Sequence, residues 1–137
     1  MPAEAKGTTA ASAKAFAKYY VELINHASMS GETVDLRAAS SKKCSACEAI
    51  ANEIERQYKN GGHLEGGSWT PGLASVGLSS RKTSALVSFP VRIAKQIEYA
   101  PTGKPAKTIP SATGTLDLRL IRLSGAWLVD RLDARQS

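Results

Sequence analysis

The stretch that decides the fold spans residues 84–99 and reads SALVSFPVRIAKQIEY. Its odd-numbered positions are apolar except for Lys95, and its even-numbered positions are mostly polar or small. This period of two places alternate side chains on opposite faces of a β-strand. We therefore expect one long strand over residues 84–99, with one face buried and the other in water. Pro90 falls on the wet face and indicates an edge segment or a bulge, because proline lacks the N–H that a central ladder needs.

Shorter strands are expected before this one. Residues 63–70 and 73–78 are strand candidates on either side of a turn at Pro71-Gly72. The paired glycines Gly66-Gly67 weaken the first candidate and indicate a bulge within it.

A hairpin is expected after the long strand. Residues 101–110 are rich in Pro, Lys, Gly and Thr and are predicted to form a loop. Residues 114–123 and 126–132 then predict a hairpin around Ser124-Gly125. The apolar phase slips from Ile121 onward, which fits a bulge or a strand that is buried on both faces.

Helical patterns precede all of the strands. Apolar residues recur at steps of three and four over residues 12–27, and a short second helix is expected over residues 33–39. A third helix begins at Ser45, where Ser45 and Glu48 have the spacing of a capping box. It ends before Gly61-Gly62.

This order of elements predicts an α+β fold, with three N-terminal helices packed on a curved antiparallel sheet. A chain of 137 residues is expected to form one domain. We place that single domain at residues 12–137. Residues 1–11 consist mostly of small residues with little to bury, and they are predicted to be a flexible, linker-like segment.

Charge and targeting signals narrow the compartment and the partners. The net charge is +6, but the basic residues are scattered and no basic helix accompanies them, so no nucleic-acid partner is predicted. No apolar run is long enough to span a membrane. The first residues lack the apolar core of a signal peptide, which predicts a cytoplasmic protein if Met1 is the native start. A linker-like tract, however, often follows a removed membrane anchor.

The two cysteines, Cys44 and Cys47, allow three interpretations. They form a structural disulfide at the start of the third helix, or a redox-active pair, or they stay reduced. A zinc site needs about four ligands, and His26 and His63 lie at no standard spacing, so no metal is predicted. The disulfide is favoured, with a contribution of roughly 2 kcal/mol from its short loop, and it supports an oxidising compartment.

Aromatic residues supply the candidate pocket. The residues that could line a concave apolar site are Tyr20, Tyr58, Trp69, Phe89 and Trp127. The alternative is that they fill the core. Trp69 stands out because the glycines and Pro71 beside it give its ring less to pack against.

Acid-base groups are present but unpaired in the sequence. The candidates are Tyr19, Tyr20, His26, Asp35, Asp117 and Asp130. Acid-base catalysis needs a positioned group with a shifted pKa and a partner for the proton, and no motif fixes such a pair here. We therefore predict no catalytic residue and no cofactor.

Several motifs carry a resemblance to a known superfamily. Phe16-Ala-Lys-Tyr-Tyr20, Leu23-Ile-Asn25 and Gly31-Glu-Thr-Val-Asp-Leu36 resemble the opening of nuclear transport factor two-like and SnoaL-like domains, although Glu32 stands where Asp is usual. Gly125-Ala-Trp127-Leu-Val129 resembles the start of the last strand of that fold. The resemblance implies a cone-shaped architecture of the cystatin and ketosteroid isomerase type.

A narrower resemblance concerns the middle of the chain. Cys44-x-x-Cys47, Tyr58-x-x-Gly61-Gly62 and Glu65-Gly66-Gly67, in this order, are similar to an actinobacterial lipoprotein family of unknown function. This resemblance implies an extracytoplasmic protein held by a lipid anchor outside the present chain.

Together these observations favour a non-catalytic binding module of a bacterial cell-envelope lipoprotein. Its expected partner is an unknown small molecule or an envelope protein, and it is expected to be a monomer or a homodimer. The alternative is a small-molecule isomerase, dehydratase or hydrolase with acid-base groups in the cone pocket. Fold alone does not separate the two.

Overall fold

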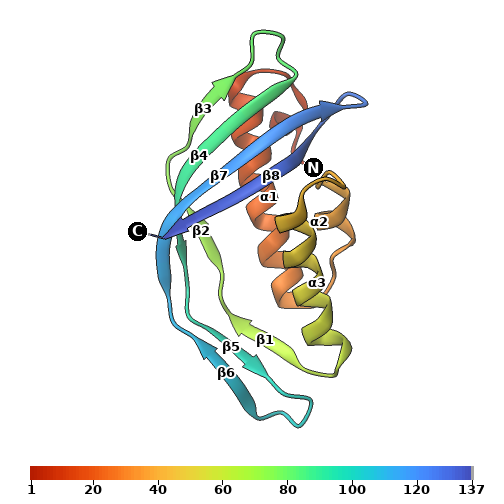
Figure 1. Cartoon of the computed structure of the whole chain (residues 1–137), viewed down its shortest axis with the longest axis vertical. Coiled ribbons are helices and arrows are strands. Elements are labelled where there is room, and N and C mark those ends of the chain that lie inside the picture. The colour runs from red at the N-terminus through yellow and green to blue at the C-terminus, as the bar shows by residue number, and fades with distance from the viewer. Residues whose placement is uncertain (137) are drawn as a thin grey trace.

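The computed structural model describes residues 1–136 and places the helices on one side of two antiparallel sheets (Figure 1). A 3-10 turn, η1 (Ala3–Lys6), precedes the helices α1 (Ala10–Ser30), α2 (Val34–Ala38) and α3 (Ser45–Lys59). The larger sheet contains β2 (Trp69–Pro71), β3 (Ser75–Leu78), β4 (Ser84–Ile93), β7 (Ala112–Leu123) and β8 (Ala126–Gln136). The smaller sheet contains β1 (His63–Gly66), β5 (Gln96–Tyr99) and β6 (Pro105–Ile109). The predicted α+β architecture is confirmed.

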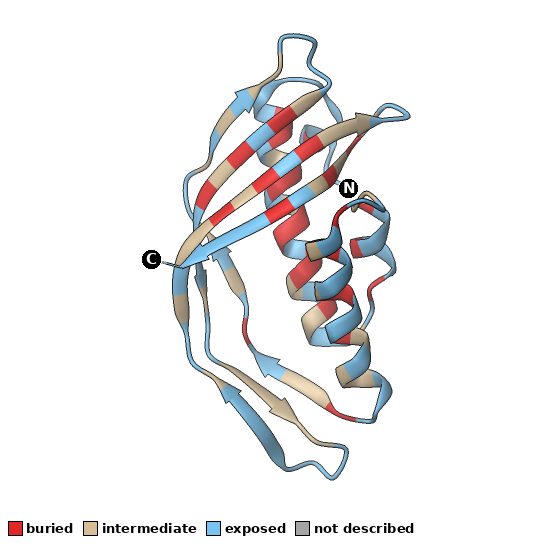
Figure 2. Ribbon diagram, viewed as in Figure 1, coloured by how far each residue is buried: buried red, intermediate tan, exposed pale blue. Residues whose placement is uncertain are grey.

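The core lies between α1 and the inner face of β4, β7 and β8 (Figure 2). Alternation along the strands puts every second side chain on this face. Val87 on β4 and Leu118 on β7 meet across the ladder and are fully buried. Phe16 and Ile24 contribute the facing stripe of α1. Within residues 1–136 no helix is long and apolar enough to cross a membrane.

The first helix starts earlier than the periodicity predicts. Thr9 caps α1, because its side-chain oxygen accepts a hydrogen bond from the N–H of Ser12 at 3.1 Å. The helix ends at Gly31, whose φ of 81° is the left-handed conformation that glycine adopts without strain.

The N-terminal segment differs from the predicted linker. Ala5 in η1 is only 1% exposed and belongs to the core, and Arg122 donates a hydrogen bond to the carbonyl of Gly7 at 2.7 Å. Small side chains let η1 lie close against α1 and β8. Residues that the composition assigned to a linker therefore cover one end of the core.

The start of α3 corrects the predicted capping box. The N-cap is Cys44, whose sulfur accepts a hydrogen bond from the N–H of Cys47 at 3.2 Å, and Ser45 is the first helical residue. Cys44 has the extended backbone of a cap, and its bond to Cys47 keeps its sulfur over the first turn. Ser45 and Glu48 therefore do not form the predicted box.

The predicted strand over residues 84–99 is divided between the two sheets. β4 ends at Ile93 and β5 begins at Gln96, so the break includes Lys95, the exception in the apolar alternation. The N–H of Gly67 donates to the carbonyl of Lys95 at 2.9 Å, and Gly66 and Gly67 have φ values of 71° and 77°. The paired glycines thus allow the segment after β1 to bend next to the break between β4 and β5.

The predicted loop over residues 101–110 is wrong, because it contains β6. β6 pairs with β5 at one edge of the smaller sheet and is almost entirely exposed. An edge strand without a buried face has no apolar alternation, so its pairing left no hydrophobic pattern in the sequence.

The hairpin of β7 and β8 contains the expected bulge, but on the second strand. The register shifts between Arg119 and Leu120, which leaves Asp130 of β8 as the extra residue. A bulge turns a side chain away from the regular alternation. Asp130 accepts a hydrogen bond from the Ser41 hydroxyl at 2.8 Å.

Candidate ligand pocket in the mouth of the cone

A cavity of about 300 Å³ opens between α1, α3 and the strands β1 and β5. Its apolar lining comprises Ile24, Ala49, Ile50, Ile54, Leu64 and Trp69. Its polar lining comprises Ser28, Glu53, Gln57, Gln96 and Glu98. A concave, mostly apolar surface with a few polar groups is the usual form of a small-molecule site.

Trp69 is held in this lining by the side chain of Asn25. The Asn25 amide donates to the carbonyl of Trp69 at 2.9 Å, and its oxygen accepts from the N–H of Trp69 at 2.8 Å. Both backbone groups of Trp69 are therefore satisfied by one side chain of α1. These two hydrogen bonds hold the first residue of β2 against α1 and so fix the position of the Trp69 ring in the cavity wall.

Tyr58 does not line the cavity but hydrogen-bonds to two residues that do, Ser28 and Leu64. Its hydroxyl donates to the carbonyl of Ser28 at 2.5 Å and accepts from the N–H of Leu64 at 3.3 Å. It thereby joins α3 to α1 and to β1, and Gly31 fits against its ring because a Cβ there would lie 2.7 Å from the ring. Gln57 adds a bond from its amide to the carbonyl of Tyr99 at 2.9 Å.

The rim of the cavity carries charged groups of both signs. Arg56 hydrogen-bonds to Glu53 and lowers the pKa of that carboxyl, which keeps it ionised near neutral pH. Glu98 lies on the opposite side of the lining. Arg56 also interacts with Glu98, so the two carboxylates are partly compensated and the rim does not favour a charged ligand of either sign.

The five aromatic candidates do not line one common pocket. Trp69 lines the cone cavity, whereas Tyr58 is outside the lining and bonds to Ser28 at its edge. Tyr20 is fully buried, and Trp127 is buried with its ring N–H donating to Ser12 at 3.4 Å. Phe89 lies in the floor of a different groove, next to α1.

The acid-base candidates lie away from the cavity. None of Tyr19, Tyr20, His26, Asp35, Asp117 and Asp130 is among its lining residues within the described chain. His26 and Asp35 are exposed, and Asp117 accepts hydrogen bonds from Ser88 and Arg135 on the outer sheet face. Tyr20 shares a hydrogen bond of 2.7 Å with Ser40, and burial raises its pKa.

Sequence reasoning missed Asn25 and Gln57, which hold the cavity together. Both are polar residues at the margin of an apolar helical stripe, where polarity usually indicates contact with water. The one available signal for Asn25 is its place in the Leu23-Ile-Asn25 motif.

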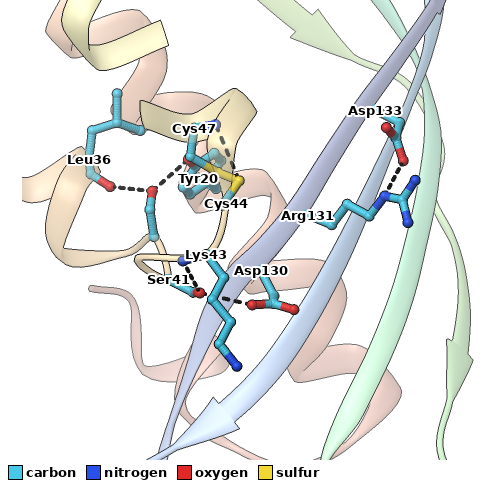
Figure 3. Close-up of a disulfide and its surroundings, with 10 residues drawn as sticks. Tyr20, Leu36, Ser41, Lys43, Cys44, Cys47, Asp130, Arg131 and Asp133 are labelled. Carbon is cyan, nitrogen blue, oxygen red and sulfur yellow. Dashed lines mark hydrogen bonds and ion pairs between the residues drawn. A yellow bond between two sulfur atoms is a disulfide. The ribbon is translucent and has the colours of Figure 1, made fainter. Parts of the chain in front are cut away.

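The predicted disulfide between Cys44 and Cys47 is confirmed, with a Cα separation of 5.2 Å (Figure 3). Next to it, the N–H of Ser41 donates to the carbonyl of Val129 at 2.8 Å, and Val129 donates to Ala39 at 2.9 Å. The crosslink therefore stabilises the connection between α2 and α3 where it lies against β8. A disulfide is typical of an oxidising, extracytoplasmic environment. Across residues 1–136 no cluster of potential metal ligands is found.

Residues 1–133 match a family described as a family of unknown function (DUF6318). The chain belongs to this family. A comparison with curated proteins gives no match.

Solved structures share the fold of this DUF6318 member. The intermembrane space region of the chloroplast protein ARC6 is 14% identical, with a TM-score of 0.68, over 94% of this chain and 98% of that chain. A protein from Novosphingobium aromaticivorans, provisionally named a scytalone dehydratase, is 14% identical, with a TM-score of 0.63, over 91% and 84%. A Nostoc punctiforme protein of unknown function with a cystatin-like fold is 6% identical, with a TM-score of 0.59, over 90% of each chain. The predicted cone fold of the nuclear transport factor two-like and SnoaL-like type is confirmed, and these identities establish the fold alone.

Proposed function

We propose that the chain is a non-catalytic binding module that takes a small, uncharged, largely apolar molecule into the mouth of the cone. One observation carries the proposal: the cavity of about 300 Å³ has aliphatic walls and a tryptophan that Asn25 holds in place. An apolar body would contact Ile50, Ile54 and Trp69. A hydrogen-bonding end of the ligand would face Gln57 or Gln96.

The same lining supports binding over acid-base catalysis. A general acid or base needs a partner that completes the proton transfer. Two carboxyls border the cavity, Glu53, which is engaged by Arg56, and the half-buried Glu98, and no hydrogen bond joins them. Within residues 1–136 the lining includes no histidine, tyrosine or aspartate. The fold shared with a provisionally named dehydratase adds no residue to this site.

The proposed setting is the bacterial cell envelope, with a lipid anchor outside the present chain. The buried disulfide supports an oxidising compartment, and the order of the Cys44, Tyr58 and Glu65 motifs supports the lipoprotein resemblance. An envelope protein that docks on the rim of the cone is the other partner compatible with this setting.

Binding can be tested with N-phenyl-1-naphthylamine, an uncharged dye whose emission rises when it leaves water. Ala49→Phe puts a ring in the mouth of the cavity from an exposed position of α3. We expect this variant to weaken dye binding about tenfold or more, the equivalent of ~1.4 kcal/mol. Ala38→Phe, on the exposed face of α2, makes the same change elsewhere and is expected to bind normally. The proposal is wrong if the wild-type protein shows no saturable binding, or if both variants lose it equally.

The role of Asn25 can be measured separately. Asn25→Ala leaves two backbone groups of Trp69 without their partner, so we expect the free energy of unfolding to fall by about 1–3 kcal/mol. Acrylamide quenching of tryptophan emission should increase, because Trp69 is released while Trp127 stays buried. Asn52→Ala removes one exposed hydrogen bond to Arg37 and should change stability by less than about 0.5 kcal/mol. Equal effects of the two variants would contradict the anchoring role.

A further inference from the structure

A second groove lies between α1 and the connection from β2 to β3. Its volume is about 440 Å³. The apolar lining comprises Ala17, Pro71, Gly72, Leu73, Ala74 and Phe89. The remaining lining residues are Lys14 and Lys18 of α1. None of these residues borders the cavity in the mouth of the cone.

The groove exists because the partner of β4 is interrupted. The carbonyl of Pro90 accepts a hydrogen bond from the N–H of Gly72 at 2.7 Å, so the nitrogen of Pro90 also faces the side where β2 and β3 lie. That nitrogen carries no hydrogen, and the ladder cannot continue past it. β2 therefore ends at Pro71, β3 begins at Ser75, and the intervening residues border the groove over Phe89.

The charge on the groove is positive throughout. Lys14 and Lys18 are four residues apart on α1, and no acidic side chain borders the groove. Among residues 1–136 neither ammonium forms an ion pair within 4.0 Å. Like charges at this helical spacing repel one another. An anion between them would remove that repulsion and gain two attractive contacts.

The rim of the groove carries an apolar side chain without a packing partner. Leu73 is 94% exposed, the most exposed of the large hydrophobic residues described. It stands beside a floor of Ala17 and Phe89, which is already apolar. An acyl chain along this floor would pack against Leu73 and would remove apolar area of both from water.

From this combination we propose that the groove binds a monomeric straight-chain carboxylate of the fatty-acid class. The carboxylate lies between Lys14 and Lys18, and the alkyl chain lies on Phe89 and Ala17 under Leu73. A single acyl chain suits a concave groove of this size, whereas a bilayer surface would need several protruding apolar side chains. This second site is independent of the function proposed for the cone.

Isothermal titration calorimetry with decanoate, kept below its micelle concentration, tests the proposal. We expect saturable binding of one decanoate per chain, and about fourfold tighter binding for each additional buried methylene in the series from octanoate to laurate. Decyltrimethylammonium has the same chain and the opposite charge, and it should bind at least tenfold more weakly. Leu73→Ser should weaken decanoate several-fold. Equal affinities for the two headgroups, or no dependence on chain length, would overturn the proposal.

Charge reversal gives the sharper test. The double variant Lys14→Glu/Lys18→Glu should lose decanoate and bind decyltrimethylammonium instead. Lys42→Glu/Lys43→Glu changes the net charge equally at two exposed lysines outside the groove and should keep the wild-type preference. Circular dichroism confirms that both variants fold. Equal losses in the two double variants would show a response to net charge alone and would overturn the site.

Two further measurements separate this site from its alternatives. Ala49→Phe obstructs the cone and should leave decanoate binding unchanged, and a loss in that variant would place the carboxylate in the cone instead. Co-sedimentation with vesicles of phosphatidylcholine and phosphatidylglycerol tests a bilayer as the occupant. Vesicle binding without saturable binding of monomeric decanoate would replace the proposal with a membrane-contact surface.

Discussion

The hydroxyl of Tyr20 lies in the core and hydrogen-bonds to the hydroxyl of Ser40, which in turn donates to the carbonyl of Leu36 at 2.8 Å. The sequence presented Tyr20 both as a pocket aromatic and as an acid-base candidate. Its position on the apolar stripe of α1 is compatible with a core residue and with a pocket residue, because both give the same helical period. The structure shows that Tyr20 is a core residue whose hydroxyl is bonded to Ser40, just after α2. This contact spans 20 residues and cannot be read from the local sequence.

Tyr20 also predicts a pH dependence of stability. Burial raises its pKa above the ordinary value of 10.0, and the bond to Ser40 acts in the opposite direction. The unfolded chain therefore loses this proton first, so the contribution of Tyr20 is complete below pH 10.0 and is lost as the pH rises toward the raised folded value. Urea unfolding of wild type and Tyr20→Phe across this range measures it.

The comparison with Tyr20→Phe isolates this group from the other titrating residues. At neutral pH the variant should be less stable by about 1 kcal/mol, because one hydrogen bond is lost. Above pH 10.0 the wild-type curve should fall toward that of the variant. Two curves that stay parallel would show that Tyr20 ionises equally in the folded and unfolded chains.

At the scale of elements, the start of α3 combines a crosslink with a helix cap. Cys44 supplies both, through its bond to Cys47 and through its sulfur as acceptor for the N–H of Cys47. The two functions can be separated by the isomeric variants Cys44→Ser/Cys47→Ala and Cys44→Ala/Cys47→Ser. They have the same composition and differ only in where the hydroxyl stands.

Both variants should be less stable than the oxidised protein, by roughly 2 kcal/mol for the lost loop closure. Serine at position 44 can still cap α3, so the first variant should exceed the second by about 0.5–2 kcal/mol in urea unfolding. Hydrogen exchange at Ser41 and Val129 should accelerate in both, because the disulfide no longer fixes the connection that pairs with β8. Equal stability of the two isomers would remove Cys44 as the cap.

Elements with a buried face were predictable from their apolar pattern, and β1 and β3 were found from the turns around them, whereas the almost fully exposed β6 was not found. The stripes of α1 and α3 and the alternation of β4 and β7 follow from burial, and the structure contains all of them. β6 has no buried face, so its composition predicted a loop. The break between β4 and β5 was missed for a related reason. Ile97 and Tyr99 continue the alternation although they belong to the other sheet.

At the scale of the whole molecule, the two concave sites arise where the sheets depart from regular pairing. The cone cavity lies where β1 and β5 bend away from the larger sheet, and the lysine-lined groove lies where Pro90 separates β2 from β3. The sequence marked both places with glycines or proline. It could not show which side chains the bends bring together, because Asn25 and Trp69 are 44 residues apart.

The N-terminal segment provides the last test, because it closes one end of the molecule. Ala5→Glu places a carboxylate where the side chain is 1% exposed, so η1 must either bury a charge or leave α1 and β8. Undocking limits the cost, which we expect to be about 1–3 kcal/mol in urea unfolding. Ala3→Glu makes the same change at an exposed position of the same turn and should cost less than about 0.5 kcal/mol.

Limited proteolysis resolves the same event locally. Trypsin needs a locally opened segment to cleave after a lysine. Cleavage after Lys6 should therefore be faster in Ala5→Glu, where η1 leaves α1, than in Ala3→Glu or wild type. A linker over residues 1–11 would instead be cut at the same rapid rate in all three proteins, with no difference in unfolding. Faster cleavage confined to Ala5→Glu would show that the small residues of this segment are selected by packing: alanine fits at position 5 because a larger or charged side chain cannot lie against α1.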